Sequence, residues 1–300
     1  MDKFKSMQVF CRVVELGSFT AVAREWDLSP TMVGKHVTYL EKQLGLSLLT
    51  RTTRRISLTE AGRGYYQRSK QLLEDLEELE NSVSALGEGA RGTLVVAAPI
   101  DFGLMYLVPA ITLFRQSHPN ITVSLGLENR FIDLSSGDYD LSIRITDTPH
   151  HGMIAKRITT TELCTFASPG YLAAQGEPQI IADLHRHRCL GYINTPHSNH
   201  WLFHDQGQPV EFKCRWQFAS NNGTALCEAA AMDMGIIQVP STTARPYLAD
   251  GRLREILLDY CVRDLPVYAF YLQRRFIPAK ITAFVSFLQD YFASQQLTVA

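Results

Sequence analysis

The sequence predicts an α/β protein with an N-terminal all-α winged helix-turn-helix domain, a long linker helix and a two-subdomain α/β body. Three observations predict this organisation. Helix-boundary signals and helical spacing fill the first 45 residues, a heptad pattern follows residue 60, and strands alternate with helices after residue 92. We expect domains at 1–59, 60–91 and 92–300, the last divided into subdomain I (92–162 and 267–300) and subdomain II (163–266).

The composition is that of a globular protein. Of the 300 residues, 46% are hydrophobic and 20% are charged, and no apolar stretch approaches the ~18 residues of a membrane span. The N-terminus lacks the apolar core of a secretory signal. Six scattered cysteines without a CxxC motif favour reduced thiols. We therefore expect a cytoplasmic protein with no membrane partner.

Charge is distributed unevenly along the chain, although the net charge is only −1. Residues 1–70 contain twelve Lys and Arg against six Asp and Glu, residues 71–91 contain one base and six acids, and the remainder carries −2. A basic head, an acidic connector and a near-neutral body indicate a nucleic-acid module joined to a different kind of domain. Charge alone leaves chance as the alternative, so the helix pattern must decide.

The head has three helices in helix-turn-helix order. Apolar residues at helical spacing predict a first helix over 4–16, and a second begins near 18–20. Ser29 as N-cap, Pro30 at the first helical position and Gly45 as C-terminal signal bound a third helix between them. The expected buried stripe of this third helix is Val33, Val37, Leu40 and Leu44. In this motif the second helix of the pair enters the major groove of DNA.

The exposed face of the third helix and the segment that follows supply candidate DNA contacts. Lys35 and His36 can donate to base edges or phosphates, and Gly34 lets the backbone approach DNA. Segment 46–59 predicts a hairpin wing with clustered arginines, which can enter a minor groove or hold phosphates. A solvated helix face and a basic surface loop are the alternatives. The predicted DNA-binding residues are Thr20, Ser29, Pro30, Thr31, Met32, Gly34, Lys35, His36, Thr38, Arg51, Arg54 and Arg55.

Residues 18–67, SFTAVAREWDLSPTMVGKHVTYLEKQLGLSLLTRTTRRISLTEAGRGYYQ, resemble the DNA-binding domain of the LysR-type transcriptional regulators. The family pattern is matched without a gap. Gly34 and His36 depart from it, because the family usually has Ser and Gln there, so operator preference cannot be copied from relatives. The resemblance implies a sequence-specific DNA-binding transcription regulator whose partners are double-stranded operator or promoter DNA, RNA polymerase and a second copy of itself.

The connector carries a heptad seam with spacings of 4, 3, 4 and 3 in a helix expected from Glu60 to Gly87 and capped by Thr59. The predicted dimerisation residues are Leu72, Leu76, Leu79, Val83 and Leu86. The resemblance implies that two such helices pair, giving a homodimer or homotetramer, and packing on the chain's own body is the alternative. Segment 87–92 is a literal GxGxxG, but it follows a helix and precedes a strand, which indicates a hinge instead of a dinucleotide site.

The body reads as β-α-β-α-β, with strands at 94–99, 121–128 and 140–145, followed by a second α/β run from 163. It resembles the LysR-type effector domain, which is similar to a periplasmic binding protein. The matching segments are 109–119, 138–144, 167–172, 235–240 and 251–253.

Two such subdomains leave a cleft for a small-molecule effector. The predicted effector-binding residues are Ile100, Asp101, Phe102, Arg144, Asn222 and Gly223. Relatives often place Ser or Thr near Asp101 to bind carboxylates. A carboxylate there predicts a cationic, neutral or proton-linked effector, and a helix cap is the alternative role.

Signals of catalysis are weak in this sequence. There is no P-loop, HExxH or GxSxG motif. The histidine-rich stretch lacks the short convergent spacing of a zinc site. Its members are His185, His187, Cys189, His197, His200 and His204. We expect no metal, no cofactor and no enzyme activity, and keep as alternative a cytoplasmic ligand-binding or enzymatic domain with an accessory interaction head.

Overall fold

The computed structural model of the chain describes residues 1–51, 56–84, 90–147, 152–193, 200–273 and 277–294. The chain divides into two compact units, Met1–Gly89 and Ala90–Ala300. Among the described residues, no helix combines the length and apolar character needed to cross a bilayer. The boundaries expected from the sequence between residues 59 and 60, 91 and 92, 162 and 163, and 266 and 267 stay predictions.

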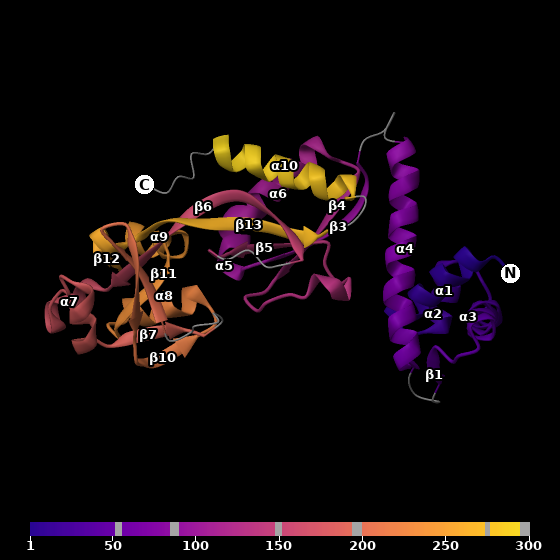
Figure 1. Ribbon diagram of the computed structural model, residues 1–300, viewed down its shortest axis with the longest axis horizontal. Coiled ribbons are helices and arrows are strands. Elements are labelled where there is room, and N and C mark those ends of the chain that lie inside the picture. Colours follow the sequence, from indigo (N-terminus) through magenta and orange to yellow (C-terminus); the bar gives the residue numbers. More distant parts are fainter. Residues whose placement is uncertain (52–55, 85–89, 148–151, 194–199, 274–276, 295–300) are drawn as a thin grey trace. The chain divides into compact units, whose positions relative to one another are not determined.

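In its described residues the first unit forms helices and a hairpin (Figure 1), namely α1 (Lys3–Leu16), α2 (Phe19–Glu25), α3 (Pro30–Leu44), β1 (Leu49–Arg51), β2 (Ile56–Leu58) and α4 (Glu60–Ser84). The boundary signals of α3 act as predicted. Ser29 Oγ accepts a hydrogen bond from the backbone N of Met32 at 3.2 Å, and Gly45 ends the helix with φ of 68°, in the left-handed region that favours glycine. These local signals fix the length of α3.

The core of the first unit holds α3 by one face. Val33, Val37 and Leu40 have no exposed surface and pack with residues of α1 and the hairpin. The buried stripe is shorter than predicted, because Leu44 is the last residue of the helix and is 40% exposed. The opposite face of α3 is therefore the one left to a partner.

Helix α4 begins where the sequence predicts. Thr59 Oγ1 accepts a hydrogen bond from the backbone N of Gly62 at 2.9 Å. The first turns pack on α1, where the ring centroids of Phe10 and Tyr65 lie 5.7 Å apart, and Ser69 is buried. The beginning of α4 thus belongs to the core of the head.

The second unit is built on a nine-stranded mixed sheet in the order β10-β7-β11-β6-β13-β5-β3-β4, with β12 also paired to β6. Strand β3 is parallel to β4 and β5, and β7 is parallel to β10 and β11, as the alternation of strands and helices favours. The strands are β3 (Gly92–Ala98), β4 (Ile121–Leu127), β5 (Leu141–Ile145), β6 (Met153–Ala167), β7 (Cys189–Tyr192), β10 (Trp216–Ser220), β11 (Ile236–Pro240), β12 (Arg254–Ile256) and β13 (Val262–Leu272), with a separate hairpin of β8 (His200–Asp205) and β9 (Gln208–Lys213).

Strands β6 and β13 run antiparallel through both halves of this unit (Figure 1), from Leu163 opposite Val262 to Met153 opposite Leu272. Each half has its own hydrophobic core, one around Phe114 and Phe284 and the other around Phe166 and Leu226. Two cores joined by two shared strands give the two-subdomain architecture expected.

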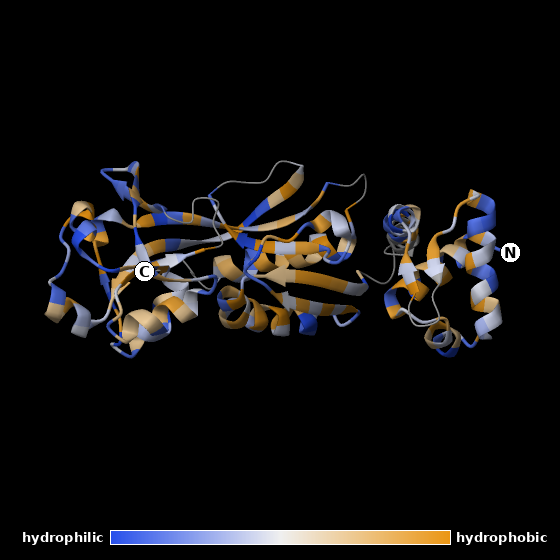
Figure 2. Ribbon diagram, turned by 90° about the horizontal axis from the view of Figure 1, so that it is seen from below, coloured by the Kyte–Doolittle hydropathy of each residue, from blue (hydrophilic) through white to orange (hydrophobic). Residues whose placement is uncertain are grey.

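The helices of the second unit cover its sheet, and Figure 2 shows that they carry both hydrophobic and hydrophilic residues, as elements with one face in a core do. They are α5 (Ile100–Phe102), a π-helical turn (Gly103–Leu107), α6 (Val108–Ser117), α7 (Pro169–Gln175), α8 (Gly223–Ala231), α9 (Ser241–Ala249) and α10 (Ala279–Ser294), with 3-10 turns at Leu134–Ser136, Ile181–Arg186 and Leu258–Tyr260. The segment between β3 and β4 thus consists of three successive helical pieces, α5, the π-helical turn and α6.

Candidate functional site

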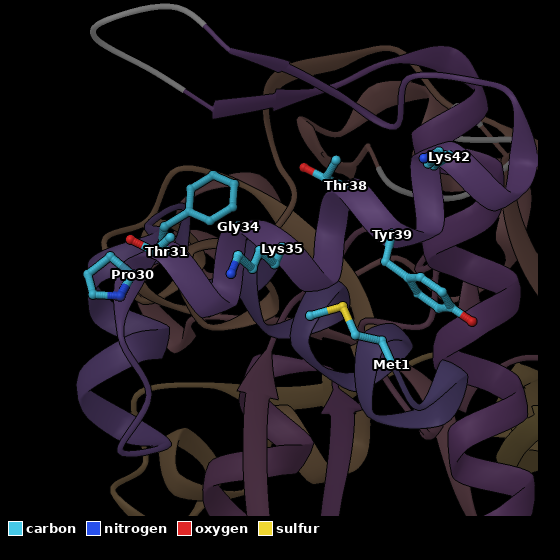
Figure 3. Close-up of a pocket in the computed structure, with 9 residues that line it drawn as sticks. Met1, Pro30, Thr31, Gly34, Lys35, Thr38, Tyr39 and Lys42 are labelled. Atoms are coloured by element: carbon cyan, nitrogen blue, oxygen red, sulfur yellow. The ribbon is translucent and has the colours of Figure 1, made fainter.

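The exposed face of α3 borders an open pocket of the first unit (Figure 3). Five of the predicted DNA-binding residues line it, and four further residues join them there: Pro30, Thr31, Gly34, Lys35 and Thr38, with Met1, Phe19, Tyr39 and Lys42. Side chains three, four or seven positions apart lie on one face of a helix, which is why this set converges. The sequence analysis did not include Lys42, although the same spacing from Lys35 and Thr38 could have identified it.

Thr20, Ser29 and Met32 are exposed but lie outside the pocket lining. Ser29 uses its hydroxyl to cap α3, which leaves the side chain a structural role at the helix start. Met32 is 37% exposed and presents an apolar group beside Thr31.

The prediction that His36 lies on the exposed face is wrong. His36 is 6% exposed, and its Nδ1 lies 2.9 Å from Ser6 Oγ on α1. Because the Ser6 hydroxyl donates to the carbonyl of Asp2 at 2.6 Å, Nδ1 carries the proton and donates to Ser6. Burial, and then the charge of Lys5, lower the pKa of His36. A neutral His36 therefore fastens α3 to α1, on the same stripe as Val33 and Leu40.

The predicted hairpin wing is present as β1 and β2, paired antiparallel with Leu49 opposite Leu58. The carboxylate of Glu41 on α3 accepts hydrogen bonds from the backbone N of Leu48 at 2.9 Å and of Leu49 at 3.2 Å, which ties the hairpin to the helix. Arg51 is the last residue of β1, whereas Arg54 and Arg55 lie outside the described residues.

In the second unit, three of the predicted effector residues come together at the start of α8. Asp101 Oδ1 accepts hydrogen bonds from Thr224 Oγ1 at 2.7 Å and from Asn222 Nδ2 at 3.4 Å. Asn222 also caps α8 through the backbone N of Ala225 at 2.8 Å. Asp101 thus places a negative charge at the positive end of a helix, and its contacts join α5 to α8 across the two halves of the unit.

Gly223 allows this close approach. A Cβ at that position would lie 2.8 Å from Asp101 Oδ2 and 2.9 Å from Thr243 Cγ2, both too short for real contacts. Asn129 holds the same junction from the other side: its Oδ1 accepts from the backbone N of Ile100 at 2.9 Å, and its Nδ2 donates to the carbonyl of Asn221 at 2.8 Å. Asn129 was missed by the sequence analysis, although it follows a strand end as Ile100 does.

Arg144, the predicted effector residue that carries a positive charge, lies on β5 and makes its contacts with residues other than Asp101, Asn222 and Gly223. Its guanidinium donates to the carbonyl of Arg130 and lies 5.9 Å from the ring of Phe131, while its Nε is buried without a hydrogen-bond partner among the described residues. Burial lowers the pKa of Arg144, opposed by Tyr192. Burial also raises the pKa of Tyr192 to about 12, with a further contribution from the charge of Asp101. Arg144, Tyr192 and Asp101 therefore share one electrostatic environment.

The prediction that Phe102 lines the cleft is wrong. Phe102 is 3% exposed, stacks on Tyr106 with ring centroids 5.5 Å apart and contacts Phe292 at 5.8 Å. On the short helix α5 it points into the core, whereas its neighbour Asp101 points to α8. Neighbouring positions on a helix face different directions, so Asp101 and Phe102 cannot both face the cleft.

The heptad seam of α4 is only partly described. Leu72 is 47% exposed and Leu76 is half-buried, whereas their neighbour Leu73 packs on the core of the head. Leu79 and Val83 lie within α4, and Leu86 lies outside the described residues. Pairing through this seam stays a prediction.

Three of the histidines considered as metal ligands have other contacts. His200 Nδ1 lies 3.4 Å from Glu211, His187 Nδ1 lies 3.3 Å from the Tyr171 hydroxyl, and the tilted rings of His185 and Phe212 have centroids 4.7 Å apart. His197 lies outside the described residues. Among the residues that the structure describes, the group with metal-ligating atoms close together is a different one, Cys164, Glu255 and Cys261, which the sequence analysis missed.

A helix-turn-helix head with one exposed face of α3, followed by a two-halved α/β body with a polar junction, defines a DNA-binding regulator with a ligand-binding domain. Two family models match the chain: the bacterial regulatory helix-turn-helix protein model of the lysR family over residues 4–63, and the LysR substrate binding domain over residues 87–293. The chain belongs to the LysR-type transcriptional regulators.

Relatives and solved structures agree with this membership. An uncharacterised HTH-type transcriptional regulator of Haemophilus influenzae is 36% identical, over 94% of this chain and 98% of its own. The structure of CrgA, a LysR-type regulator of Neisseria meningitidis, is 29% identical with a TM-score of 0.59, covering 96% of this chain and 98% of its own. That of the Vibrio cholerae virulence activator AphB is 27% identical with a TM-score of 0.59, covering 97% and 99%. The family is one of regulators, so the enzymatic alternative is set aside.

Proposed function

We propose that the exposed face of α3 reads operator DNA through Thr31, Lys35 and Thr38, with Gly34 at the closest backbone approach. The observation that carries this proposal is that these four residues line one pocket opposite the buried stripe. Lys42 extends the face, and Arg51, Arg54 and Arg55 of the wing contact phosphates. His36 is not part of this interface.

A binding selection from random duplexes tests these roles. Lys35→Ala and Thr31→Ala should change which sequences are selected, because base-edge contacts carry sequence information. Arg54→Ala should weaken binding to all sequences alike and reduce the salt dependence of binding. Lys213→Ala, an exposed lysine of the second unit, is the control and should change neither. Unchanged selection by Lys35→Ala and Thr31→Ala would contradict the assignment.

The effector of the second unit, in this proposal, is a neutral molecule with a hydrogen-bond acceptor, held between Asp101 and Arg144. Asp101 already supplies the anion at the start of α8, so a carboxylate would be repelled there. The buried Nε of Arg144 offers a donor, and Phe131 and Tyr192 offer aromatic surface beside it.

Pairs of small molecules that share one carbon skeleton but carry either an amide or a carboxylate provide the test. The measurement is the rise in the unfolding temperature of the full chain that each molecule causes. Amides should stabilise the wild type more than their carboxylate partners, and Asp101→Asn should remove this preference. Asp259→Asn, an exposed carboxylate on a 3-10 turn, should keep it. Carboxylates that stabilise the wild type better than amides would overturn the proposed effector class.

The regulator, in this proposal, forms dimers or tetramers through the α4 seam and acts with RNA polymerase at promoters in the cytoplasm, on the nucleoid. The exposure of Leu72 supports the seam. Leu72→Asp should lower the sedimentation coefficient, whereas Leu258→Asp, equally exposed on the second unit, should not. A Leu72→Asp protein that sediments as the wild type does would contradict pairing through α4.

A further inference from the structure

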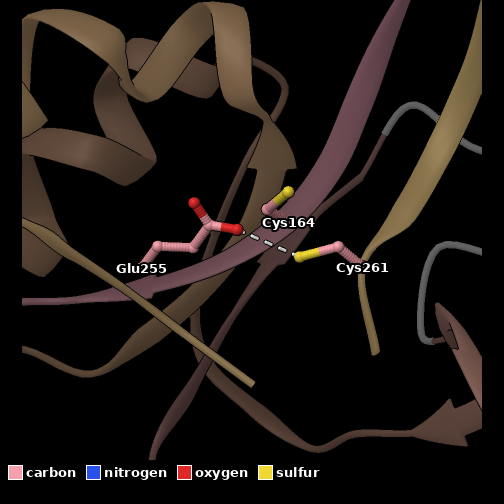
Figure 4. Close-up of side chains that lie close together, drawn as sticks. All are labelled: Cys164, Glu255 and Cys261. Carbon is pink, nitrogen blue, oxygen red and sulfur yellow. Dashed lines mark hydrogen bonds between the residues drawn. The ribbon is translucent and has the colours of Figure 1, made fainter. Parts of the chain in front are cut away.

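Three side chains that the proposed function does not use converge where β6, β12 and β13 meet (Figure 4). Cys164 belongs to β6, Glu255 to β12, and Cys261 immediately precedes β13. Since Leu163 lies opposite Val262 in the antiparallel pair, the next step in register sets Cys164 opposite Cys261. Glu255 lies opposite Phe166, two residues beyond Cys164 on the same face of β6.

The ligand atoms of the three side chains form a compact group. One sulfur or carboxylate oxygen from each lies within 4.8 Å of the others, and Cys261 Sγ donates to Glu255 Oε1 at 3.1 Å. Cys164 has no exposed surface and Cys261 is 5% exposed, whereas Glu255 is half-buried. The thiols therefore lie in the interior, and the carboxylate gives the group one side open to solvent.

The chemistry of this group suits a thiophilic divalent cation. Two thiolates and a carboxylate are ligands of Zn²⁺. Ligand atoms about 2.0–2.3 Å from a tetrahedral zinc lie roughly 3.3–3.8 Å from one another. The ligand atoms of this group lie within 4.8 Å of one another and would have to approach by about 1 Å to bind zinc. A cation would also neutralise the charges of two thiolates and a carboxylate, which otherwise repel one another.

The charges around the group have their own partners. Glu162 on β6 lies beside Cys164, with Sγ and Oε2 4.0 Å apart, but its other oxygen is bound by Arg263 at 3.0 Å. Arg263 also donates to the carbonyl of Leu258 at 3.0 Å. Glu162 is thus held by a cation of its own, which leaves Glu255 as the carboxylate available to a metal.

We propose that Cys164, Cys261 and Glu255 bind one thiophilic divalent cation such as Zn²⁺, with a solvent molecule as the fourth ligand. Binding converts two thiols to thiolates and releases two protons to solvent, with no change of oxidation state. The site joins three strands, two of which, β6 and β13, run through both halves of the unit. A metal there stiffens the strands on which the two halves meet.

Cobalt substitution of the full-length, reduced, tag-free protein tests the proposal, because Co²⁺ bound by thiolates gives sulfur-to-metal charge-transfer bands. The wild type should bind one equivalent with these bands, and Zn²⁺ should displace it and raise the unfolding temperature of the second unit. Cys261→Ala should abolish the bands, and Glu255→Gln should weaken Co²⁺ binding at least tenfold with the bands shifted.

Two matched variants control for indirect effects. Cys227→Ala removes a buried cysteine of the same half outside the group, and Glu162→Gln removes the neighbouring carboxylate. Both should keep the wild-type bands. Co²⁺ binding without charge-transfer bands, or bands that persist in Cys261→Ala, overturns the site. Loss of binding in Glu162→Gln with none in Glu255→Gln overturns the ligand set. Circular dichroism of each variant distinguishes lost ligation from lost folding.

Discussion

The exposed face of α3 and the junction of α5 with α8 differ in whether their side chains face away from the core or are held by hydrogen bonds within the chain. On α3, Thr31 and Lys35 border an open pocket and face away from the core. At the junction, the Asp101 carboxylate is already bound by Asn222 and Thr224. A rigid partner such as duplex DNA can meet the first surface as it stands, whereas a ligand of the second must compete with internal contacts. We therefore expect the head to bind DNA without rearrangement and the body to rearrange when it binds a ligand.

Replacing a glycine by alanine should destabilise the junction and stabilise α3. The larger change in the free energy of unfolding is expected at the junction. Gly223→Ala adds a Cβ 2.8 Å from Asp101 Oδ2 and should destabilise the second unit by about 1–3 kcal/mol, the usual range for overpacking. Thermal unfolding of the full chain measures this, with DNA binding by the head as the internal control. A second unit as stable as the wild type would show that the junction is looser than its contacts indicate.

His36 tests whether the buried side of α3 is separate from its reading side. His36→Gln should cost the head about 0.5–1.5 kcal/mol, the net value of one hydrogen bond, and leave sequence preference unchanged. A shift in selected sequences on this substitution would place His36 at the DNA after all.

The pH dependence of the head has a definite sign. Burial holds the pKa of folded His36 below its ordinary value of 6.5, so the unfolded chain binds the proton more readily. The stability that the head gains from a neutral His36 is fully present above pH 6.5. It is lost as the pH falls below 6.5 towards the pKa of His36 in the folded head. Denaturant titrations at several pH values should show that loss in the wild type and a flatter profile in His36→Gln. His204→Gln, in the second unit, should leave the slope as it is.

Gly34→Ala is expected to have the smallest effect on stability, and its sign is reversed. A Cβ at Gly34 meets no atom within 4 Å, so alanine should stabilise α3 by up to about 1 kcal/mol. The same methyl group should weaken DNA binding, because we place the DNA backbone or bases against this position. Unfolding and duplex binding measured on one preparation separate the two effects. A more stable head with undiminished DNA affinity would remove Gly34 from the interface.

Local signals made the head the more predictable region. Ser29, Pro30 and Gly45 mark the ends of α3 through interactions within a few residues, and the structure places the helix between them. His36 was predicted on the exposed face because its imidazole can donate to base edges or phosphates. It lies three positions after Val33 and four before Leu40, so the helical period already assigned it to the buried stripe.

In the body, Asp101, Asn222 and Gly223 lie together because strand ends and helix starts share one edge of a sheet. Their role in binding an effector stays a prediction. Asn129 follows the end of β4 and Tyr192 is the last residue of β7, so the same rule could have identified both, although their partners are remote in the chain.

Local patterns in the sequence were enough to assign the family, the order of the elements and the bounds of α3, because these depend on periodicity, caps and a contiguous motif. Only the tertiary structure decided which charged groups meet. Cys164, Glu255 and Cys261 form a group only because strand pairing brings distant residues into one register. Asp101 faces α8 only because two separate cores set α5 against it. Such contacts depend on packing between segments remote in the chain, and no local pattern encodes them.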